Sequence, residues 1–336
     1  MGNQDNKVDV TIPANRSDVE GVRPTDLTRD LPQIVELLRK VFGETLDSDD
    51  RRWLQDANHG AMPDFLYRFN PAAARLANGF VWESGGRIVG NVTILPTKAW
   101  GRFLVANVAV DPNHRREGIA RRLMQTVAES LRSRGGRTIL LQVVKDNTAA
   151  IELYRSLEYQ NVGTMTTWYA TPSRIRQINN IEITGKLPEI RPLPDRLWRM
   201  AYQLDTACVP ADLNWPDPLH PEVYHRTIWR RFSDFMNGRQ METWATVENH
   251  GRLSGLGNIS GEWGRAHLLS LRIDPNWHGQ LERPLLAKLL RRLTYLPRRN
   301  VRIDHSHDDE VVNELLIEAN FYKQRILTHM RLDLVN

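Results

Sequence analysis

The 336-residue chain has one cysteine, Cys208, and no long apolar run. A single cysteine excludes an intramolecular disulfide and any metal cluster built on several cysteines. No stretch approaches the roughly 20 apolar residues that a membrane-spanning helix needs. Residues 1–18 are polar and lack the apolar core of a secretory signal peptide. We therefore predict a cytoplasmic protein without a membrane partner.

A strong charge imbalance is also missing. The net charge is +5, and 41% hydrophobic with 25% charged residues suit a globular protein with a full core. Nucleic-acid binding usually needs a broad basic face with interleaved aromatic residues, whereas the clearest basic cluster here is confined to residues 115–122. We predict no nucleic-acid partner.

The stretch 305–310, HSHDDE, combines histidines with acids. Its two histidines have strand spacing and lack the i, i+4 spacing of helical zinc motifs. The acids that follow suit the first turn of a helix, where the dipole favours negative charge. We predict no metal site.

Residues 104–122, LVANVAVDPNHRREGIARR, carry the clearest motif of the chain. They read as an apolar strand, a Pro-Asn turn, a basic loop with a glycine, and an amphipathic helix. Loop N–H groups and the helix N-terminus attract an anion, and Gly118 lets a phosphate come closer than any Cβ would allow. Positive charge is added by Arg115, Arg116, Arg121 and Arg122. The expected ligand is a diphosphate.

Two stretches resemble the signatures of the GNAT superfamily of acyl-CoA-dependent N-acyltransferases. Arg115-x-x-Gly118-x-Ala120 is similar to the family's pyrophosphate loop, Gln/Arg-x-x-Gly-x-Gly/Ala. Residues 147–159, NTAAIELYRSLEY, resemble its second signature, Asn-x-x-Ala-x-x-x-Tyr-x-x-Leu-Gly-Phe. AVDP before the loop and LQVVKDN before the second signature look most like the alanine acetyltransferases that modify ribosomal-protein N-termini.

The resemblance implies acetyl-CoA as co-substrate and a set of residues that bind it. In the family, the pantetheine arm lies along the strand before the loop and the pyrophosphate binds to the loop. The first Asn of the second signature donates or accepts a hydrogen bond with the arm. The predicted cofactor-binding residues are Val108, Ala109, Val110, Arg115, Arg116, Glu117, Gly118, Ile119, Ala120, Arg121 and Asn147.

Tyr154 is the predicted catalytic acid. A phenol with a pKa near 10 stays protonated at pH 7 and can protonate a departing thiolate. Two plainer interpretations stand beside these roles: Tyr154 as a helix aromatic packed on the sheet, and Asn147 as a helix cap.

The general base of the relatives is missing. Gln142 stands where the resembling alanine acetyltransferases have Glu, and residues 105–107 (VAN) stand where other members place a carboxylate. Deprotonation through water, through Glu83 or Glu152, or by capture of the neutral fraction of the amine remain alternatives.

The second half of the chain repeats the first. Residues 100–102 (WGR) recur at 263–265 and residues 111–113 (DPN) at 274–276, both 163 residues later, whereas Tyr159 corresponds to Phe321 at 162. Such self-similarity predicts two tandem domains. The family resemblance implies that each is GNAT-like, α/β (α+β), with a central mixed, mostly antiparallel sheet flanked by helices. The predicted parts are a disordered lead (1–18), a CoA-binding GNAT domain (19–170), a proline-punctuated linker (171–195) and a degenerate GNAT-like domain (196–336).

The second copy differs where the chemistry is expected. Gly118 corresponds to Leu281, whose side chain blocks a phosphate, and Tyr154 corresponds to Leu316 or Ile317, neither of which can donate a proton. We predict no CoA site there.

Local patterns also predict individual elements. We expect a strand at 19–22, a helix over 31–42 capped by Asp30, strands at 101–110 and 137–144, and a helix with Tyr154 capped by Asp146. Two hairpins are expected, at 79–95 around Gly85-Gly86 and at 242–259. The family resemblance, in turn, implies a variable helix and loop over 47–75.

The sequence thus predicts an N-acetyltransferase of the acyltransferase class that moves the acetyl group of acetyl-CoA to a primary amine of a small molecule, peptide or protein. The alternative is a catalytically lapsed CoA-binding sensor or protein-interaction module. A homodimer is left open.

Overall fold

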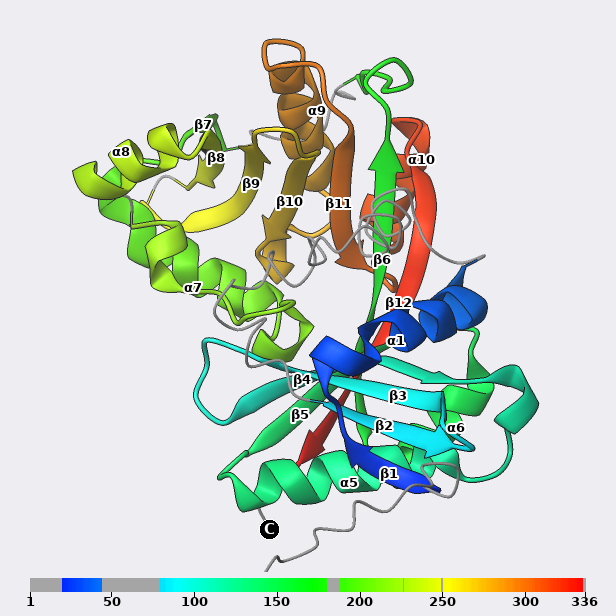
Figure 1. The fold of residues 1–336 in the computed structure, drawn as a ribbon. Coiled ribbons are helices and arrows are strands. Elements are labelled where there is room, and N and C mark those ends of the chain that lie inside the picture. The colour runs from blue at the N-terminus through cyan, green and yellow to red at the C-terminus, as the bar shows by residue number, and fades with distance from the viewer. Residues whose placement is uncertain (1–19, 44–78, 180–187, 226, 249, 335–336) are drawn as a thin grey trace, which may run out of the picture. The chain divides into compact units, whose positions relative to one another are not determined.

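The computed structural model describes residues 20–43, 79–179, 188–225, 227–248 and 250–334 (Figure 1). Contacts divide the chain into two compact units, the first with residues 1–96, 103–137 and 334–336, the second with 97–102 and 138–333. The predicted domains follow the internal repeat instead, and their boundaries stay a prediction. The predicted lead (1–18) and the predicted variable segment (47–75) lie outside the described residues.

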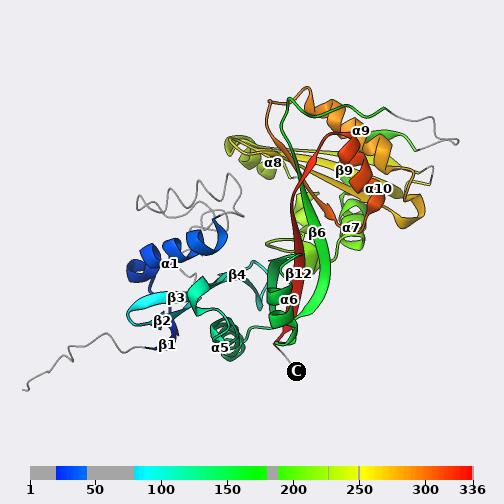
Figure 2. The same cartoon turned by 90° about the vertical axis from the view of Figure 1, so that its right-hand side faces the viewer.

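The first unit is an antiparallel sheet between two helices. Its strands are, in spatial order, β1 (Gly21–Pro24), β2 (Gly79–Ser84), β3 (Arg87–Pro96) and β4 (Arg102–Val110). Helices α1 (Leu27–Phe42) and α5 (Ile119–Ser133) cover opposite faces of the sheet (Figure 2). The β2–β3 hairpin turns at Gly85 and Gly86, both with positive φ, which confirms the prediction. Strand β1 begins two residues later than predicted.

Asp30 does not cap α1, so this prediction was wrong. The helix begins at Leu27, which places Asp30 in its first turn. There the buried carboxylate accepts hydrogen bonds from the Asp26 N–H (2.9 Å) and from Arg23 (2.6 Å). Burial opposes its ionisation, but the bonds from Arg23, Asp26 and Arg29 outweigh burial and lower its pKa to about 2. Asp30 therefore ties α1 to β1.

The second unit holds a mixed, mostly antiparallel sheet flanked by helices, which confirms the predicted fold class. Only β10 and β11 pair in parallel among its described strand pairs. The strands are, in spatial order, β5 (Thr138–Val144), β12 (Tyr322–Asp333), β6 (Gln160–Ala170), β11 (Val301–Ser306), β10 (His267–Ile273), β9 (Leu253–Glu262), β8 (Arg239–Val247) and β7 (Ile190–Pro192). The helices are α6 (Thr148–Arg155), α7 (Trp198–Cys208), α8 (Ile228–Met236), α9 (Glu282–Leu293) and α10 (Glu310–Glu318).

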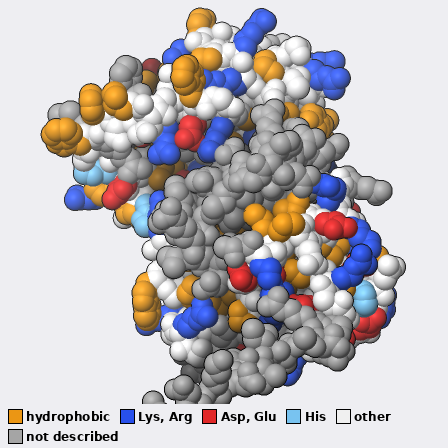
Figure 3. Space-filling model, viewed as in Figure 1, with side chains coloured by type: hydrophobic (Ala, Val, Ile, Leu, Met, Phe, Trp, Pro, Cys, Tyr) orange, Lys and Arg blue, Asp and Glu red, His pale blue; other side chains and the backbone are white. Residues whose placement is uncertain are grey.

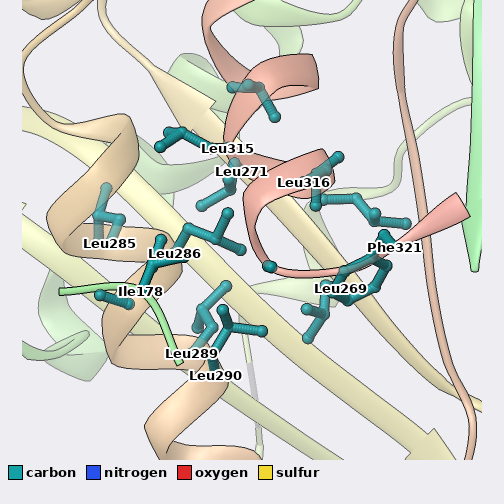
Figure 4. Packing of buried hydrophobic residues seen from close by; sticks show 14 of the residues in the cluster. Ile178, Leu269, Leu271, Leu285, Leu286, Leu289, Leu290, Leu315, Leu316 and Phe321 are labelled. Atoms are coloured by element: carbon teal, nitrogen blue, oxygen red, sulfur yellow. The ribbon is translucent and has the colours of Figure 1, made fainter. Parts of the chain in front are cut away.

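A leucine-rich core lies under α9 and α10 (Figure 4). Leu285 and Leu289 of α9 pack directly on β9, where Gly255 and Gly257 leave room for them: an added Cβ would lie 2.8 and 3.1 Å from these side chains. Helix α7 covers the other face, where Ala201 and Leu204 join a second cluster.

The last strands of the two repeats are exchanged. Strand β12, from the second repeat, pairs with β5 and β6 of the first, while β6 pairs with β11 of the second. The cross-strand pair Gln142–His329 has its counterpart 162 residues away in Asp304–Thr167. Bulges at 162 and 324 keep the same offset. The four neighbouring strands β5, β12, β6 and β11 are therefore related by a pseudo-two-fold axis between β12 and β6.

Helix α8 presents an apolar stripe to solvent (Figure 3). Trp229, Phe232 and Met236 are 82%, 58% and 67% exposed and follow helical spacing. Within the described parts of the chain, no helix combines the length and apolar character that crossing a membrane requires.

Candidate functional site

The loop after β4 starts from a fixed turn. Asp111 accepts the Asn113 N–H at 3.0 Å and so begins the short 3-10 helix η2 (Pro112–His114). Lys40 of α1 holds the same carboxylate at 2.8 Å. Residues 115–118 then follow, all exposed, before Ile119 buries the start of α5. The turn that precedes the basic loop, residues 115–118, is therefore anchored in place.

Gly118 is the N-cap of α5 and lies in the left-handed region, with φ 79°. A Cβ added there would meet no heavy atom within 4 Å, so the space above this residue is open. Gly118 makes no side-chain cap of the helix, and the N-terminus of a helix attracts anions through its N–H groups and its dipole. Arg116 also has a positive φ, of 69°. This geometry can accept a negatively charged group. We call the loop of residues 115–118, with the start of α5, the cradle.

Strand β4 is distorted just before the loop. Its pairing with β3 slips between Asn91 and Thr93, and Asn107 has a φ of 53°, which together mark a β-bulge at residues 107–108. The Asn91 side chain, 1% exposed, donates a hydrogen bond of 2.9 Å to the Asn107 carbonyl and holds the bulge. Asn91 was not among the predicted site residues, although an isolated Asn inside the apolar run 88–95 was a signal.

Val108 lies in the bulge, and Ala109 and Val110 follow it and lead into the loop. Ala109 is buried against α1 and pairs with Asn91, while Val110 pairs with Gly90. The first unit therefore brings the predicted strand and loop residues into one continuous segment, from residue 108 to residue 121.

Asn147 and Tyr154 belong to the second unit. Asn147, not Asp146 as predicted, caps α6, and its side chain accepts the Ala150 N–H at 3.1 Å. Tyr154 is 6% exposed and lies 5.8 Å from the Tyr159 ring. Burial raises the pKa of Tyr154 above its ordinary value of 10. Both plainer interpretations, a cap and a packed aromatic, thus describe real contacts of these residues.

The candidate bases differ in their surroundings. Glu83 forms ion pairs with Arg23 and Arg29 at the first unit's sheet, so its carboxylate is already engaged. Glu152 is exposed on α6. Gln142 points to His329, with 3.0 Å between the amide nitrogen and the imidazole Nε2.

The matching loop of the second repeat is closed. Leu281 takes the place of Gly118, with a φ of −100°, and is fully buried. Glu282 follows it, 1% exposed, and accepts the Gly279 N–H at 2.9 Å, so the loop binds its own carboxylate. The helix caps Asn147 and Asp309 align at 162, which matches Tyr154 with the buried Leu316.

The strand before that loop is also changed. Strand β10 pairs regularly with β9, without a bulge. Arg272, at the position of Ala109, is hydrogen-bonded to Asp205.

The histidine and acid stretch serves the helix that follows it. Asp309 accepts the Val312 N–H at 3.1 Å and caps α10, while His305 lies 2.7 Å from its other oxygen. A search of the described residues finds no group of three His, Cys, Asp or Glu side chains that could hold a metal ion.

Comparisons with known proteins match the first half of the chain to one family. Residues 35–159 match the acetyltransferase (GNAT) family. The ribosomal protein bS18-alanine N-acetyltransferase of Escherichia coli K12 is 38% identical over 65 residues, which cover 19% of this chain and 44% of that protein. The N-alpha-acetyltransferase RimI of Mycobacterium tuberculosis is 36% identical over 104 residues, 30% of this chain and 64% of that protein. The chain thus spans less than two thirds of the length of these relatives.

Two solved structures share the architecture over nearly the whole chain. A tandem GNAT protein from the clavulanic acid biosynthesis pathway has a TM-score of 0.51 at 18% identity and covers 94% of this chain and 98% of its own. A GCN5-related N-acetyltransferase from Sphaerobacter thermophilus has a TM-score of 0.57 at 16% identity, with 94% and 96% covered. The chain therefore shares the fold of these two proteins, and its residues 35–159 match the acetyltransferase (GNAT) family.

Proposed function

We propose that this chain is an N-acetyltransferase that moves the acetyl group of acetyl-CoA to a primary amine of a small molecule, peptide or protein. The observation that carries the proposal is the cradle at Gly118. An open, left-handed glycine at a helix N-terminus, beside four arginines of residues 115–122, suits a diphosphate.

The donor would be held by the residues predicted from the sequence. The N–H groups of residues 117–121 would receive the diphosphate, and the guanidinium groups of Arg115, Arg116 and Arg121 would add charge. Residues 108–110 would hold the pantetheine arm through backbone groups, and Asn147 would contact the arm as well as cap α6. Acetyl-CoA would supply the thioester.

The bulge in β4 fits the need for a backbone donor at the thioester carbonyl. A bulge leaves one residue out of the ladder and re-aims its backbone groups. A fixed N–H of that kind is worth about 3 kcal/mol when it stabilises charge on an acyl oxygen. Asn91 would then act through the bulge, as a positioning residue.

Tyr154 would donate the proton to the departing thiolate. A phenol with pKa 10 is weaker than a thiol near 8.5, so the transfer costs about 2 kcal/mol in free energy. The burial that raises the pKa of Tyr154 increases this cost, while it keeps the hydroxyl protonated at every physiological pH. The Tyr154 hydroxyl would therefore donate a hydrogen bond to the sulfur of the leaving group. The proton would be transferred only as the thiolate forms.

We base the proposed class of acceptor amine on the names of the relatives. The Escherichia coli and Mycobacterium tuberculosis relatives are named for alanine and N-alpha acetylation, so peptide N-termini are the first acceptors to test. Because Glu83 is engaged by two arginines, we favour water or Glu152 for removal of the proton.

The second repeat would be a scaffold without a donor site. Its loop is filled by Leu281 and by the Glu282 carboxylate, which occupies the place of an anion. We keep residues 19–170 and 196–336 as the proposed repeat units. The cytoplasmic location and the homodimer stay predictions.

The test is calorimetric titration with acetyl-CoA, followed by thiol release with three acceptors: a short peptide that begins with alanine, an N-terminally blocked peptide with one lysine, and butylamine. We expect one site per chain and release that depends on the amine. Gly118→Glu should abolish binding, because it places a carboxylate against the diphosphate.

Gly135→Glu is the matched control. Gly135 lies just beyond the other end of α5, also with a positive φ (77°) and with open space at its Cβ, so backbone strain and charge change alike. Unchanged affinity in Gly118→Glu would rule out the cradle. Binding without release of thiol by any acceptor would contradict the enzymatic proposal.

A further inference from the structure

A cavity of about 500 Å³ lies in the first unit, between the sheet and the second half of α5. Binding sites for small molecules commonly enclose roughly 300 to 1,000 Å³. On the sheet side, Phe80 and Ile94 form an apolar floor. Phe80 faces α5 because its neighbour Val81 packs on the opposite face of the sheet, against α1. The cavity therefore has the size and the apolar base of a small-molecule site.

Small side chains on α5 leave this space open. The helix turns about 100° per residue, so Thr126, Ser130 and Ser133 share one face, within about 60° of each other. All three line the cavity. The neighbouring face carries the longer side chains that fill the core: Ile119, Leu123, Met124, Val127 and Leu131. The hollow thus follows from the sequence of α5, in which short hydroxyl residues stand beside the apolar stripe.

The sheet side of the cavity also holds an unsatisfied hydroxyl group. Among the described residues, the Thr25 Oγ1 atom is buried without a hydrogen-bond partner. It lies beside Gly79, where an added Cβ would be 3.3 Å from Thr25 Oγ1 and 2.3 Å from the Val92 carbonyl oxygen. Both Thr25 and Gly79 line the cavity. A buried hydroxyl without a partner costs stability, and a polar ligand in the cavity would supply the missing bond.

Two opposite charges stand on the helix side. Glu129 and Arg134 are exposed and line the cavity. Within the part of the chain that the structure describes, neither side chain forms an ion pair. Arg134 is the C-cap of α5, about 7 Å further along the helix axis than Glu129. The cavity therefore offers one carboxylate and one guanidinium, both available to a ligand.

A ligand that uses all of these groups carries an ammonium, a carboxylate and an apolar side chain. The ammonium would pair with Glu129, and the planar guanidinium of Arg134 matches the geometry of a carboxylate. The apolar part would cover Phe80 and Ile94, while a polar atom of the ligand would reach the Thr25 hydroxyl. A diphosphate or another polyanion is disfavoured here, because Glu129 would repel it.

We propose that this cavity binds a free α-amino acid with an apolar side chain. The site is separate from the cradle, since residues 118 and 130 stand about 18 Å apart along α5. No acetyl transfer is involved, so the inference goes beyond the proposed function and does not depend on it.

NMR of the full-length, nitrogen-15-labelled protein, titrated with L-leucine in the absence of acetyl-CoA, tests the inference. Leucine should shift the amide signals of Thr25, Gly79 and Ser130 and leave that of Gly118 unchanged. Two truncated probes separate the charges: 3-methylbutylamine lacks the carboxylate, and 4-methylpentanoate lacks the ammonium. Each should bind at least about tenfold more weakly than leucine, because one charge-assisted hydrogen bond is lost.

Charge-neutral variants should show a crossed pattern. Glu129→Gln should weaken leucine binding at least about tenfold yet leave 4-methylpentanoate unchanged, because only the partner of the ammonium is removed. Arg134→Gln should weaken leucine binding likewise yet leave 3-methylbutylamine unchanged. A structural role of either side chain would not produce this dependence on the probe.

Two further variants test the place of the site. Ser130→Leu puts a bulky side chain into the cavity and should abolish binding of all three probes. Glu36→Gln is the matched control for Glu129→Gln. Glu36 is an exposed glutamate of α1, which covers the opposite face of the sheet (Figure 2), so this variant should leave the affinity for leucine unchanged.

The inference fails if leucine causes no shift, or if leucine and 3-methylbutylamine bind equally well. It fails as well if Ser130→Leu binds leucine with unchanged affinity. Because acetyl-CoA is absent from these titrations, their results hold whether or not the chain transfers an acetyl group. The failure of either proposal therefore leaves the other standing.

Discussion

Tyr154 and Tyr159 show how two like side chains differ at the scale of a single residue. Both are buried, and their rings lie 5.8 Å apart. The Tyr159 hydroxyl is buried without a hydrogen-bond partner, an arrangement that costs stability. Tyr154 occupies the tyrosine position of the second GNAT signature, whereas Tyr159 occupies its terminal aromatic position.

Tyr154→Phe should leave acetyl-CoA affinity within about twofold and lower kcat by about 10² to 10⁴, because a positioned proton donor contributes on that order. Phenylalanine keeps the ring contact and removes only the hydroxyl. Calorimetry and thiol release measure the two effects separately.

Tyr159→Phe is the control for that prediction. It removes a neighbouring hydroxyl that has no partner, so kcat should stay unchanged and stability should not fall. Equal kcat in Tyr154→Phe and wild type would remove Tyr154 from the proposed chemistry.

At the scale of the element, β4 and β10 diverge although they are repeats of each other. Strand β4 carries a bulge held by Asn91, whereas β10 pairs regularly with β9. The loop that follows is open after β4 and closed on Glu282 after β10. The bulge and the open loop therefore occur together and are lost together, which supports a shared purpose in donor binding.

Asn91→Leu should lower kcat at least tenfold with a smaller change in acetyl-CoA affinity. Leucine leaves the Asn107 carbonyl without its side-chain donor, so the bulge loses its support and a fixed N–H is misplaced. Hydrogen exchange of the amides of residues 107 and 108 should accelerate as well.

Ser254→Ala, on strand β9, which matches β3 in the second repeat, is the control. Ser254 is also fully buried in a strand, but no bulge follows it, so kcat should be unchanged. Full kcat in Asn91→Leu would mean that the bulge has no part in catalysis.

At the scale of the whole molecule, the exchange of last strands makes the two repeats depend on each other. Strand β12 fills the place between β5 and β6, with pairing along residues 138–144 and 160–169. Without it, both strands would expose unpaired backbone groups, and exposed strand edges lead to aggregation.

A fragment of residues 1–170 should therefore be insoluble or fail to bind acetyl-CoA. Co-expression with residues 171–336 should restore a soluble, binding-competent pair, because β12 then returns to its place. Size-exclusion chromatography and calorimetry measure both. A soluble 1–170 fragment with wild-type affinity would show that the first repeat folds without the second.

Much of the fold was predictable because it rests on short-range patterns. The β2–β3 hairpin follows from Gly85-Gly86, and α5 from its apolar spacing and the glycines on both sides. The repeat was visible because the two copies kept the same short motifs at a nearly fixed offset. Where several residues compete for one local role, the prediction failed: Asn147 rather than Asp146 caps α6, and Asp30 binds Arg23 instead of capping α1.

The sequence by itself determined the GNAT resemblance, the basic loop with Gly118, the tandem repeat and the loss of loop chemistry in the second copy. Only the tertiary structure decided that β12 crosses to β5, that His329 faces Gln142, that Asn91 holds a bulge, and that Glu282 closes the second loop. The physical reason is range. Helical spacing and turn residues act over a few neighbours, whereas strand register joins residues far apart in the chain through burial and pairing that no local pattern specifies.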